Sequence, residues 1–137
     1  MTFIPYLNFA GNCREAFERY REIFGGQLDL LTFEDMPGGA GEVPPDQAAL
    51  VMHARLVCGD AILMGSDDPS SDGTTARCAW INWFTTDGAE AERVFAELSE
   101  AGEITMPLAE TFWSPRFGMC VDRFGVGWMV NVLPPAD

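Results

Sequence analysis

The stretch NCREAFERYREIFGG, residues 12–26, decides the first half of the fold, because it is an amphipathic helix with its own start and stop signals. Apolar residues recur three and four positions apart, Asn12 and Glu15 have the spacing of a capping box, and a pair of glycines ends the run. A second stretch, DGAEAERVFAELSEAG at residues 87–102, has the same layout. Each stretch predicts a helix of about three turns.

The two helical stretches are related by a constant offset of 75 residues, from 12 to 87, which indicates an internal repeat. The offset holds for the capping residues and for the apolar face. The matched pairs are Asn12 with Asp87, Glu15 with Glu90, Ala16 with Ala91, Tyr20 with Phe95 and Ile23 with Leu98. Because caps and apolar stripes are common, a true repeat also requires that the flanking strands agree.

Strand-like segments surround the two helices in the same order. One run precedes each helix, three follow it, and a glycine-containing turn joins the last two. The runs are residues 2–9, 28–34, 48–57 and 61–64, then 77–84, 104–110, 116–121 and 128–133. Both halves therefore read βαβββ. We predict an α+β fold in a single domain, with module one at residues 1–65, a linker at 66–75 and module two at 76–137.

The composition narrows the class of partner. The 137 residues carry a formal net charge of −13, from 8 basic and 21 acidic side chains. This charge repels nucleic acid and anionic membrane surfaces, and it either attracts a cationic ligand or only maintains solubility. No apolar run is long enough to span a membrane, and the N-terminal segment lacks the features of a signal peptide. We therefore expect a cytoplasmic protein.

Two longer stretches resemble a known family: YLNFAGNCREAFERYREIFGG, residues 6–26, and MPLAETFWSPRFGMCVDRFGVGWMVN, residues 106–131. They are similar to the vicinal oxygen chelate superfamily of glyoxalases, ring-cleaving dioxygenases and bleomycin-resistance proteins, and within it to the PhnB-like branch. The resemblance implies two βαβββ modules that form a U-shaped mixed sheet around a cavity. It also implies a homodimer, in which the partner completes or covers the cavity.

Metal-dependent members of the superfamily place His and Glu ligands on the first and last strands of each module. Counting from the helix caps and the hairpin glycines puts these positions at Pro5, Leu63, Trp80 and Met129. Their side chains offer no nitrogen or oxygen donor to a hard or borderline ion, and a thioether suits only soft ions. We therefore predict that the protein binds no metal and no other cofactor.

Two alternative placements of the strands bear on a metal site. A one-residue shift of the first strands does not restore a ligand set, and the only histidine, His53, cannot form a site alone. A misplaced strand would leave room for carboxylates that converge on His53 around an ion. The shifted positions are Tyr6 and Ile81, and the candidate carboxylates are Glu34, Glu110 and Asp122.

Side chains alternate along a strand, so residues in phase with the former ligand positions should line the cavity. The predicted lining residues are Leu63, Trp80, Asn82, Met129 and Asn131. His53 points into the cavity if its apolar neighbours pack against the helix. If the protein is an enzyme, His53 is then the first candidate for its general base. The alternative is that His53 is a hydrogen-bonded structural residue.

Trp113 and Arg116 lie close together just before a predicted strand. Trp113 could stack on a ligand ring, and the guanidinium of Arg116 could bind a carboxylate or phosphate group. The alternative is that Trp113 packs at a subunit interface and that Arg116 pairs with one of the many acids.

These features leave three functional hypotheses. The first is a metal-free, glyoxalase-like homodimer that binds a small molecule, either cationic or aromatic. The second is a metal-independent enzyme that acts on a carbonyl or phosphonate substrate with His53 as base. The third is a dimeric structural or interaction module with a filled cavity. A methyltransferase is not expected, because no Gly-rich loop joins a strand to a helix, and Gly25-Gly26 follows a helix as a cap.

Overall fold

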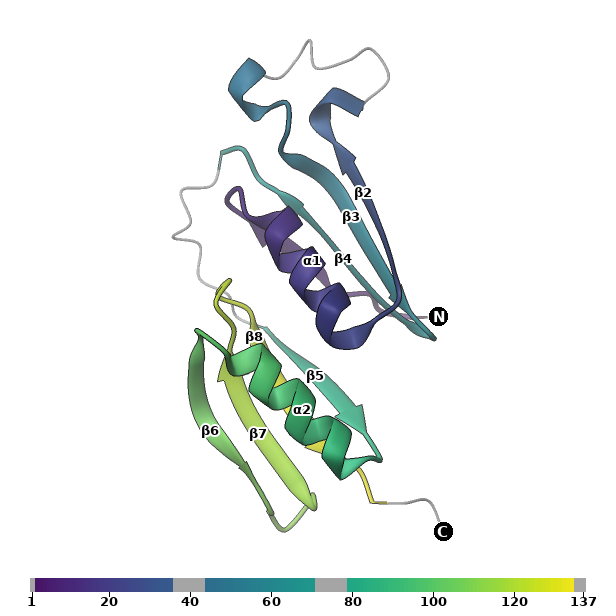
Figure 1. The fold of residues 1–137 in the computed structure, drawn as a ribbon, viewed down its shortest axis with the longest axis vertical. Coiled ribbons are helices and arrows are strands. Elements are labelled where there is room, and N and C mark those ends of the chain that lie inside the picture. Colours follow the sequence, from purple (N-terminus) through teal and green to yellow (C-terminus); the bar gives the residue numbers. More distant parts are fainter. Residues whose placement is uncertain (1, 36–43, 71–78, 135–137) are drawn as a thin grey trace. The chain divides into compact units, whose positions relative to one another are not determined.

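A computed structural model describes residues 2–35, 44–70 and 79–134 of the chain. The chain divides into two compact units, residues 1–75 and 76–137. Each unit is a four-stranded sheet with one helix on one of its faces (Figure 1). None of the helices in the described ranges is long and apolar enough to cross a membrane.

The first unit has the predicted βαβββ order. Its elements are β1 (Tyr6–Phe9), α1 (Cys13–Phe24), β2 (Gln27–Thr32), β3 (Val51–Cys58) and β4 (Ala61–Asp67), with short 3-10 turns at Phe33–Asp35 and Pro45–Gln47. The strand order in the sheet is β1-β4-β3-β2. β1 is parallel to β4, and the other neighbours are antiparallel.

The second unit repeats this arrangement. Its elements are β5 (Trp80–Thr85), α2 (Gly88–Ser99), β6 (Glu103–Ala109), β7 (Arg116–Val121) and β8 (Gly127–Val132). The strand order β5-β8-β7-β6 matches that of the first unit strand for strand, with β5 parallel to β8. The predicted α+β class and the internal βαβββ repeat are therefore confirmed.

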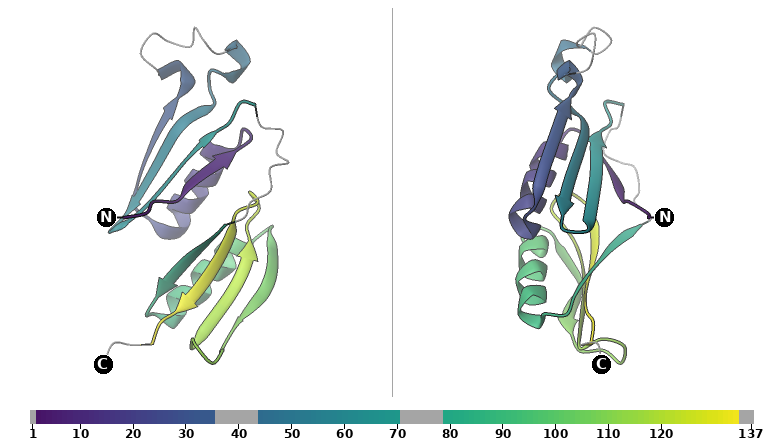
Figure 2. Two further views of the ribbon diagram at one scale, coloured as in Figure 1. Left: turned by 180° about the vertical axis from the view of Figure 1, so that it is seen from behind. Right: turned by 90° about the vertical axis from the view of Figure 1, so that its right-hand side faces the viewer.

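The core of each unit lies between the helix and one face of the sheet (Figure 2). Glycines on that face let the helix approach closely: an added Cβ would lie 2.8 Å from the Phe17 ring at Gly65, and 2.9 Å from the Phe95 ring at Gly118. These contacts identify the helix face of each sheet. We call the opposite side the open face of that sheet.

The start of α1 is stabilised differently from the prediction. Asn12 precedes the helix, but its side chain makes no capping hydrogen bond. Instead Oδ1 of Asp67 accepts hydrogen bonds from the backbone N–H groups of Gly11 and Cys13, and Oδ2 accepts one from Val51. Asp67 therefore belongs to β4 and to the core. The first module extends past residue 65, into what was predicted as linker.

The start of α2 follows the local prediction. Asp87 accepts hydrogen bonds from the backbone N–H groups of Ala89 and Glu90. The side chain of Glu90 accepts a hydrogen bond from the Thr85 hydroxyl, which in turn accepts one from the backbone N–H of Asp87. The helix N-terminus is thus closed by residues within five positions of one another.

The two modules differ in their turns, and this changes which side chains share a face. Three residues separate β1 from α1, while two separate β5 from α2. Two residues separate the paired Cys58 and Ala61, while five separate the paired Val121 and Gly127. Because side chains alternate along a strand, an odd difference in turn length moves an equivalent position to the other face.

Candidate functional site

The open face of the second unit brings together four residues that the alternation pattern selected. Trp80 pairs with Gly127 and Asn82 with Met129 across β5 and β8, and Asn131 lies two residues further along β8. The neighbouring Val130 pairs with Gly118, which faces α2, so this set lies on the opposite side. That these residues bind a ligand stays a prediction.

Trp80 lies directly on the backbone of β8. A Cβ added at Gly127 would lie 2.7 Å from the indole ring, so only glycine leaves room for the tryptophan there. Trp80 is 38% exposed, so part of it remains accessible. The arrangement provides an apolar aromatic wall at one end of the open face.

Asn131 has an amide oxygen that is buried and receives no hydrogen bond from the described residues. Its neighbours in the sheet are aromatic, because it pairs with Phe84 of β5 and with Phe117 of β7. A buried acceptor without a donor is unfavourable by about 1–3 kcal/mol. The donor of a bound molecule would satisfy it once the amide group turns toward the open face.

Trp113 extends this aromatic surface. Its ring centroid is 5.4 Å from that of Phe117 at an interplanar angle of 70°, and 4.7 Å from that of Phe112. It also lines a shallow surface pocket of about 360 Å³, formed by the connection between β6 and β7 and by Pro134. Trp113 therefore lies at the margin of the open face, through its contact with Phe117.

Leu63 does not join the predicted set. It pairs with Leu56, which is 2% exposed, and it is in phase with Gly65, where an added Cβ would clash with Phe17 of α1. Leu63 therefore lies on the helix face of the first sheet. Counting from the hairpin glycine fails because the β3–β4 turn is three residues shorter than the β7–β8 turn.

Pro5 shows the same kind of correction. It precedes β1 and is out of phase with Tyr6, which pairs with Met64 on the open face of the first sheet. The row of the first unit that corresponds to Asn82 and Met129 is therefore Tyr6 and Met64. The ends of the first strands, Phe9 and Thr85, are offset by 76 residues, although the helices are offset by 75.

Arg116 also lies outside the predicted pocket. It pairs with Val132 on the helix face, forms an ion pair with Glu92 of α2, and donates a hydrogen bond to the carbonyl of Gly88. The alternative reading, in which Arg116 pairs with an acid, is the one that the structure supports. The guanidinium holds β7 to the start of α2 and is not available on the open face.

His53 lies on the open face of the first sheet. The neighbouring Ala54 and Leu56 are buried against the helix, and His53 alternates with them. Its ring centroid is 6.0 Å from that of Tyr6, which reaches it across β4. This satisfies the condition set from the sequence. A catalytic role for His53 stays a prediction.

The alternative metal site loses one of its candidate ligands. Oδ1 of Asp122 accepts hydrogen bonds from the backbone N–H groups of Phe124 and Val126, and Oδ2 accepts one from the indole N–H of Trp128. This carboxylate closes the β7–β8 turn. Within residues 2–35, 44–70 and 79–134, no three His, Cys, Asp or Glu side chains are close enough together to hold a metal ion.

The buried cysteines have raised pKa values. Burial, with a smaller contribution from Asp67, raises the pKa of the Cys13 thiol to about 12. Burial, with a smaller contribution from Asp122, raises the pKa of Cys120 to about 11. Both thiols are therefore protonated at neutral pH, which disfavours a nucleophilic or metal-binding role.

The alternation of side chains along β5 would also have selected Phe84, which is not among the predicted lining residues. Phe84 is in phase with Trp80 and Asn82, is 60% exposed and pairs with Asn131. Phe117 could not be found in this way, because its position beside Asn131 depends on the register between β7 and β8.

Replacing Asn131 with Leu is expected to leave the free energy of unfolding unchanged or to raise it by up to about 1 kcal/mol, because it removes an unsatisfied buried acceptor. Urea denaturation followed by circular dichroism measures the change. Asn82→Leu, an exposed amide on the same face, is the control and should have little effect. A clear loss of stability in Asn131→Leu would show that the amide oxygen has a structural partner.

Nearly the whole chain is similar to known proteins. Residues 1–131 match the family described as 3-demethylubiquinone-9 3-methyltransferase. Protein YjdN of Escherichia coli (strain K12) is 34% identical over 144 residues, which cover 97% of this chain and 96% of YjdN. Protein PA1353 from Pseudomonas aeruginosa, a crystal structure, is 44% identical with a TM-score of 0.88, over 98% and 99% of the two chains.

Two more distant structures share the fold. The PhnB protein from Bacillus cereus is 24% identical with a TM-score of 0.76, over 96% and 99% of the two chains. A glyoxalase/bleomycin resistance protein/dioxygenase family enzyme from Burkholderia phytofirmans is 12% identical with a TM-score of 0.64, over 93% and 96%. At these identities the likeness concerns the fold alone.

Proposed function

The chain belongs to the family described as 3-demethylubiquinone-9 3-methyltransferase, in the PhnB-like branch of the vicinal oxygen chelate superfamily, and from this premise we propose that it binds a small molecule without a metal. The resemblance found in residues 6–26 and 106–131 is thereby confirmed. We also propose that the protein acts as a homodimer, as that resemblance implies, and that it is cytoplasmic.

The observation that carries the proposal is the buried amide oxygen of Asn131. It lies between Phe84 and Phe117, and the open-face positions of β5, β7 and β8 carry no charged side chain. This surface fits an aromatic or apolar ligand with one hydrogen-bond donor. A net charge of −13 favours a cationic donor such as an ammonium group.

We propose binding without a metal because of the side chains on the first and last strands of each sheet. The paired open-face rows of the two sheets carry Tyr6 with Met64 and Asn82 with Met129. Zinc and related ions are held in proteins by imidazole, thiolate and carboxylate groups, and these four side chains contain none of them.

The activity named in the family description finds no support in the connections between strands and helices. Methyl donors that contain a nucleoside are commonly bound at a Gly-rich turn between a strand and a helix. Here these connections are residues 10–12 and 86–87, and together they contain a single glycine, Gly11. Gly25 ends α1 with φ of 75° and donates a hydrogen bond to the carbonyl of Arg21, so the Gly-Gly pair is a helix cap.

The proposal is tested with benzylamine in a thermal-shift titration of the full chain. Benzylamine should raise Tm saturably, and Asn131→Leu should weaken this effect about tenfold or more, since it removes one charge-assisted hydrogen bond. Trimethylbenzylammonium is the matched ligand, because it keeps the ring and the charge but has no N–H donor. It should bind Asn131→Leu and wild type equally weakly.

The control variant is Gln27→Leu, which removes an exposed amide at the start of β2. The proposal fails if benzylamine binds Asn131→Leu as well as it binds the wild type. It also fails if nickel, zinc or manganese ions bind tightly at one per chain and switch on glyoxalase or dioxygenase turnover.

A further inference from the structure

The open face of the first sheet differs in chemistry from that of the second. One row across this sheet is Tyr6, Met64, Arg55 and Asp29, from β1, β4, β3 and β2. His53 lies two residues before Arg55 on the same strand and therefore on the same face. This face thus carries a guanidinium, an imidazole and a phenol, whereas the open-face positions of β5, β7 and β8 in the second unit carry neutral side chains.

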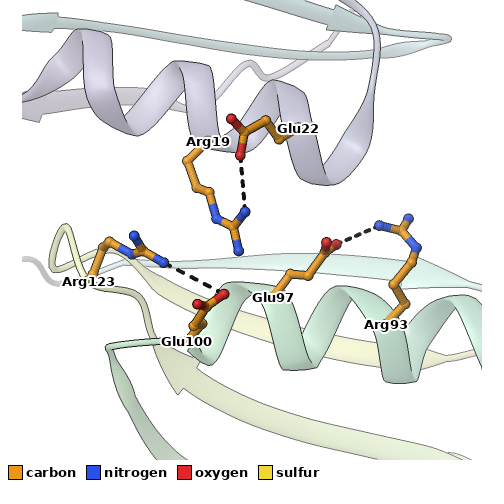
Figure 3. Close-up of polar contacts among 6 residues, drawn as sticks. All are labelled: Arg19, Glu22, Arg93, Glu97, Glu100 and Arg123. Atoms are coloured by element: carbon orange, nitrogen blue, oxygen red, sulfur yellow. Dashed lines mark hydrogen bonds and ion pairs between the residues drawn. The ribbon is translucent and has the colours of Figure 1, made fainter.

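Most described arginines are either paired or exposed on a helix. Four of them form ion pairs: Arg19 with Glu22, Arg93 with Glu97, Arg116 with Glu92 and Arg123 with Glu100. Figure 3 shows three of these pairs, on the helices and the β7–β8 turn. Arg14 and Arg21 are exposed on α1.

Arg55 fits neither group. It is half-buried on the sheet, and within the described part of the chain it has no ion pair and no hydrogen bond. Acidic side chains outnumber basic ones by 21 to 8, so a partner would be easy to supply. Withdrawing a guanidinium from water without a partner is unfavourable, and a bound anion would offset that cost.

We propose that Arg55 binds the oxyanion of a small molecule, a carboxylate or a phosphate-type group, on the open face of the first sheet. The planar guanidinium can hold two oxygens of such a group at once. His53 and Tyr6, whose ring centroids are 6.0 Å apart, lie on the same face and can donate further hydrogen bonds to such a molecule. This inference does not rest on the proposed function, since it concerns the other unit and a ligand group of opposite charge.

Asp29 is the acid that could compete with the anion. It is the cross-strand partner of Arg55 on β2, but it is exposed, and no ion pair joins the two side chains. An acid directly beside the guanidinium repels a second anion. Asp29→Asn should therefore strengthen anion binding at Arg55.

The test uses the imidazole of His53 as a reporter, because it is the only histidine of the chain. Its NMR signals are followed at constant pH and ionic strength while sodium chloride is replaced by sodium phosphate or by sodium acetate. The two anions distinguish a phosphate-type group from a carboxylate. We expect a saturable shift in the wild type with at least one of them.

Arg55→Gln should weaken this response about tenfold or more, since it removes charge-assisted hydrogen bonds. Arg21→Gln makes the same charge change on the exposed face of α1 and should leave the response intact. The proposal is overturned if neither anion acts differently from chloride. It is also overturned if Arg55→Gln and Arg21→Gln respond alike while both retain the wild-type circular dichroism spectrum.

Discussion

Asp67→Ala should lower the free energy of unfolding by about 3 kcal/mol or more, because it leaves three backbone N–H groups without their acceptor in a buried position. The carboxylate is 4% exposed, and its hydrogen bonds are 2.9–3.0 Å long. The donors belong to three different parts of the first unit: the β1–α1 connection, the start of α1 and the start of β3. Asp67 therefore joins the sheet to the helix at the end of β4.

Urea denaturation followed by circular dichroism measures this effect, and Asp87→Ala is the control. Asp87 caps α2 with an exposed carboxylate, so its loss should cost only about 1 kcal/mol. Asp67→Asn should fall between them, because its oxygen can still accept from Gly11 and Cys13, while its NH₂ would face the N–H of Val51. Equal losses in Asp67→Ala and Asp87→Ala would contradict the assignment.

Asp67 also shows which features of the fold the sequence could not predict. The helices were found because their signals lie within one or two turns of each other, as the cap at Asp87 shows. The partners of Asp67 lie 56, 54 and 16 residues away, so nothing in its neighbourhood announces them. Its Ser, Pro and Gly neighbours instead suggested a solvated linker.

The residues of the candidate site also fall into two groups: those that a local pattern could predict and those that it could not. Alternation along one strand was enough to place Trp80 with Asn82, and Met129 with Asn131. Relating one module to the other required an exact offset, and the offset changes from 75 in the helices to 76 in the first strands. A change of one residue reverses the face of a strand. Counting by the helix offset therefore puts Pro5 in the place of Tyr6, and the shorter β3–β4 turn puts Leu63 on the wrong side, although the repeat itself is correct.

The predicted pocket role of Arg116 was wrong for a different reason. Its residue type and its place beside Trp113 fitted a binding site and an ion pair equally well, and only the packing of β7 against α2 decides between them. Arg55 gives the converse case. Only the register of β2, β3 and β4 shows that, among the described residues, no acid pairs with it.

Asp122→Ala should also lower the free energy of unfolding by about 3 kcal/mol, because Asp122 is 5% exposed and accepts two hydrogen bonds from the β7–β8 turn and one from β8. One donor is the indole N–H of Trp128, at 2.9 Å, so the substitution should also shift the indole NMR signal of that tryptophan. Asp60→Ala is the matched control. Asp60 lies in the equivalent β3–β4 turn but is exposed and makes no such bond, so its loss should change stability by less than about 0.5 kcal/mol.

Asp122→Asn separates the two roles of this carboxylate. Its oxygen can still accept from the N–H groups of Phe124 and Val126, but its NH₂ would face the donor of Trp128. The turn should therefore persist while the indole signal moves as it does in Asp122→Ala. Gly127 follows this turn, and the Trp80 ring packs on it at the open face. Loosening the turn should therefore also weaken benzylamine binding. Unchanged stability in Asp122→Ala would contradict the role of the carboxylate, and unchanged binding would separate the turn from the proposed site.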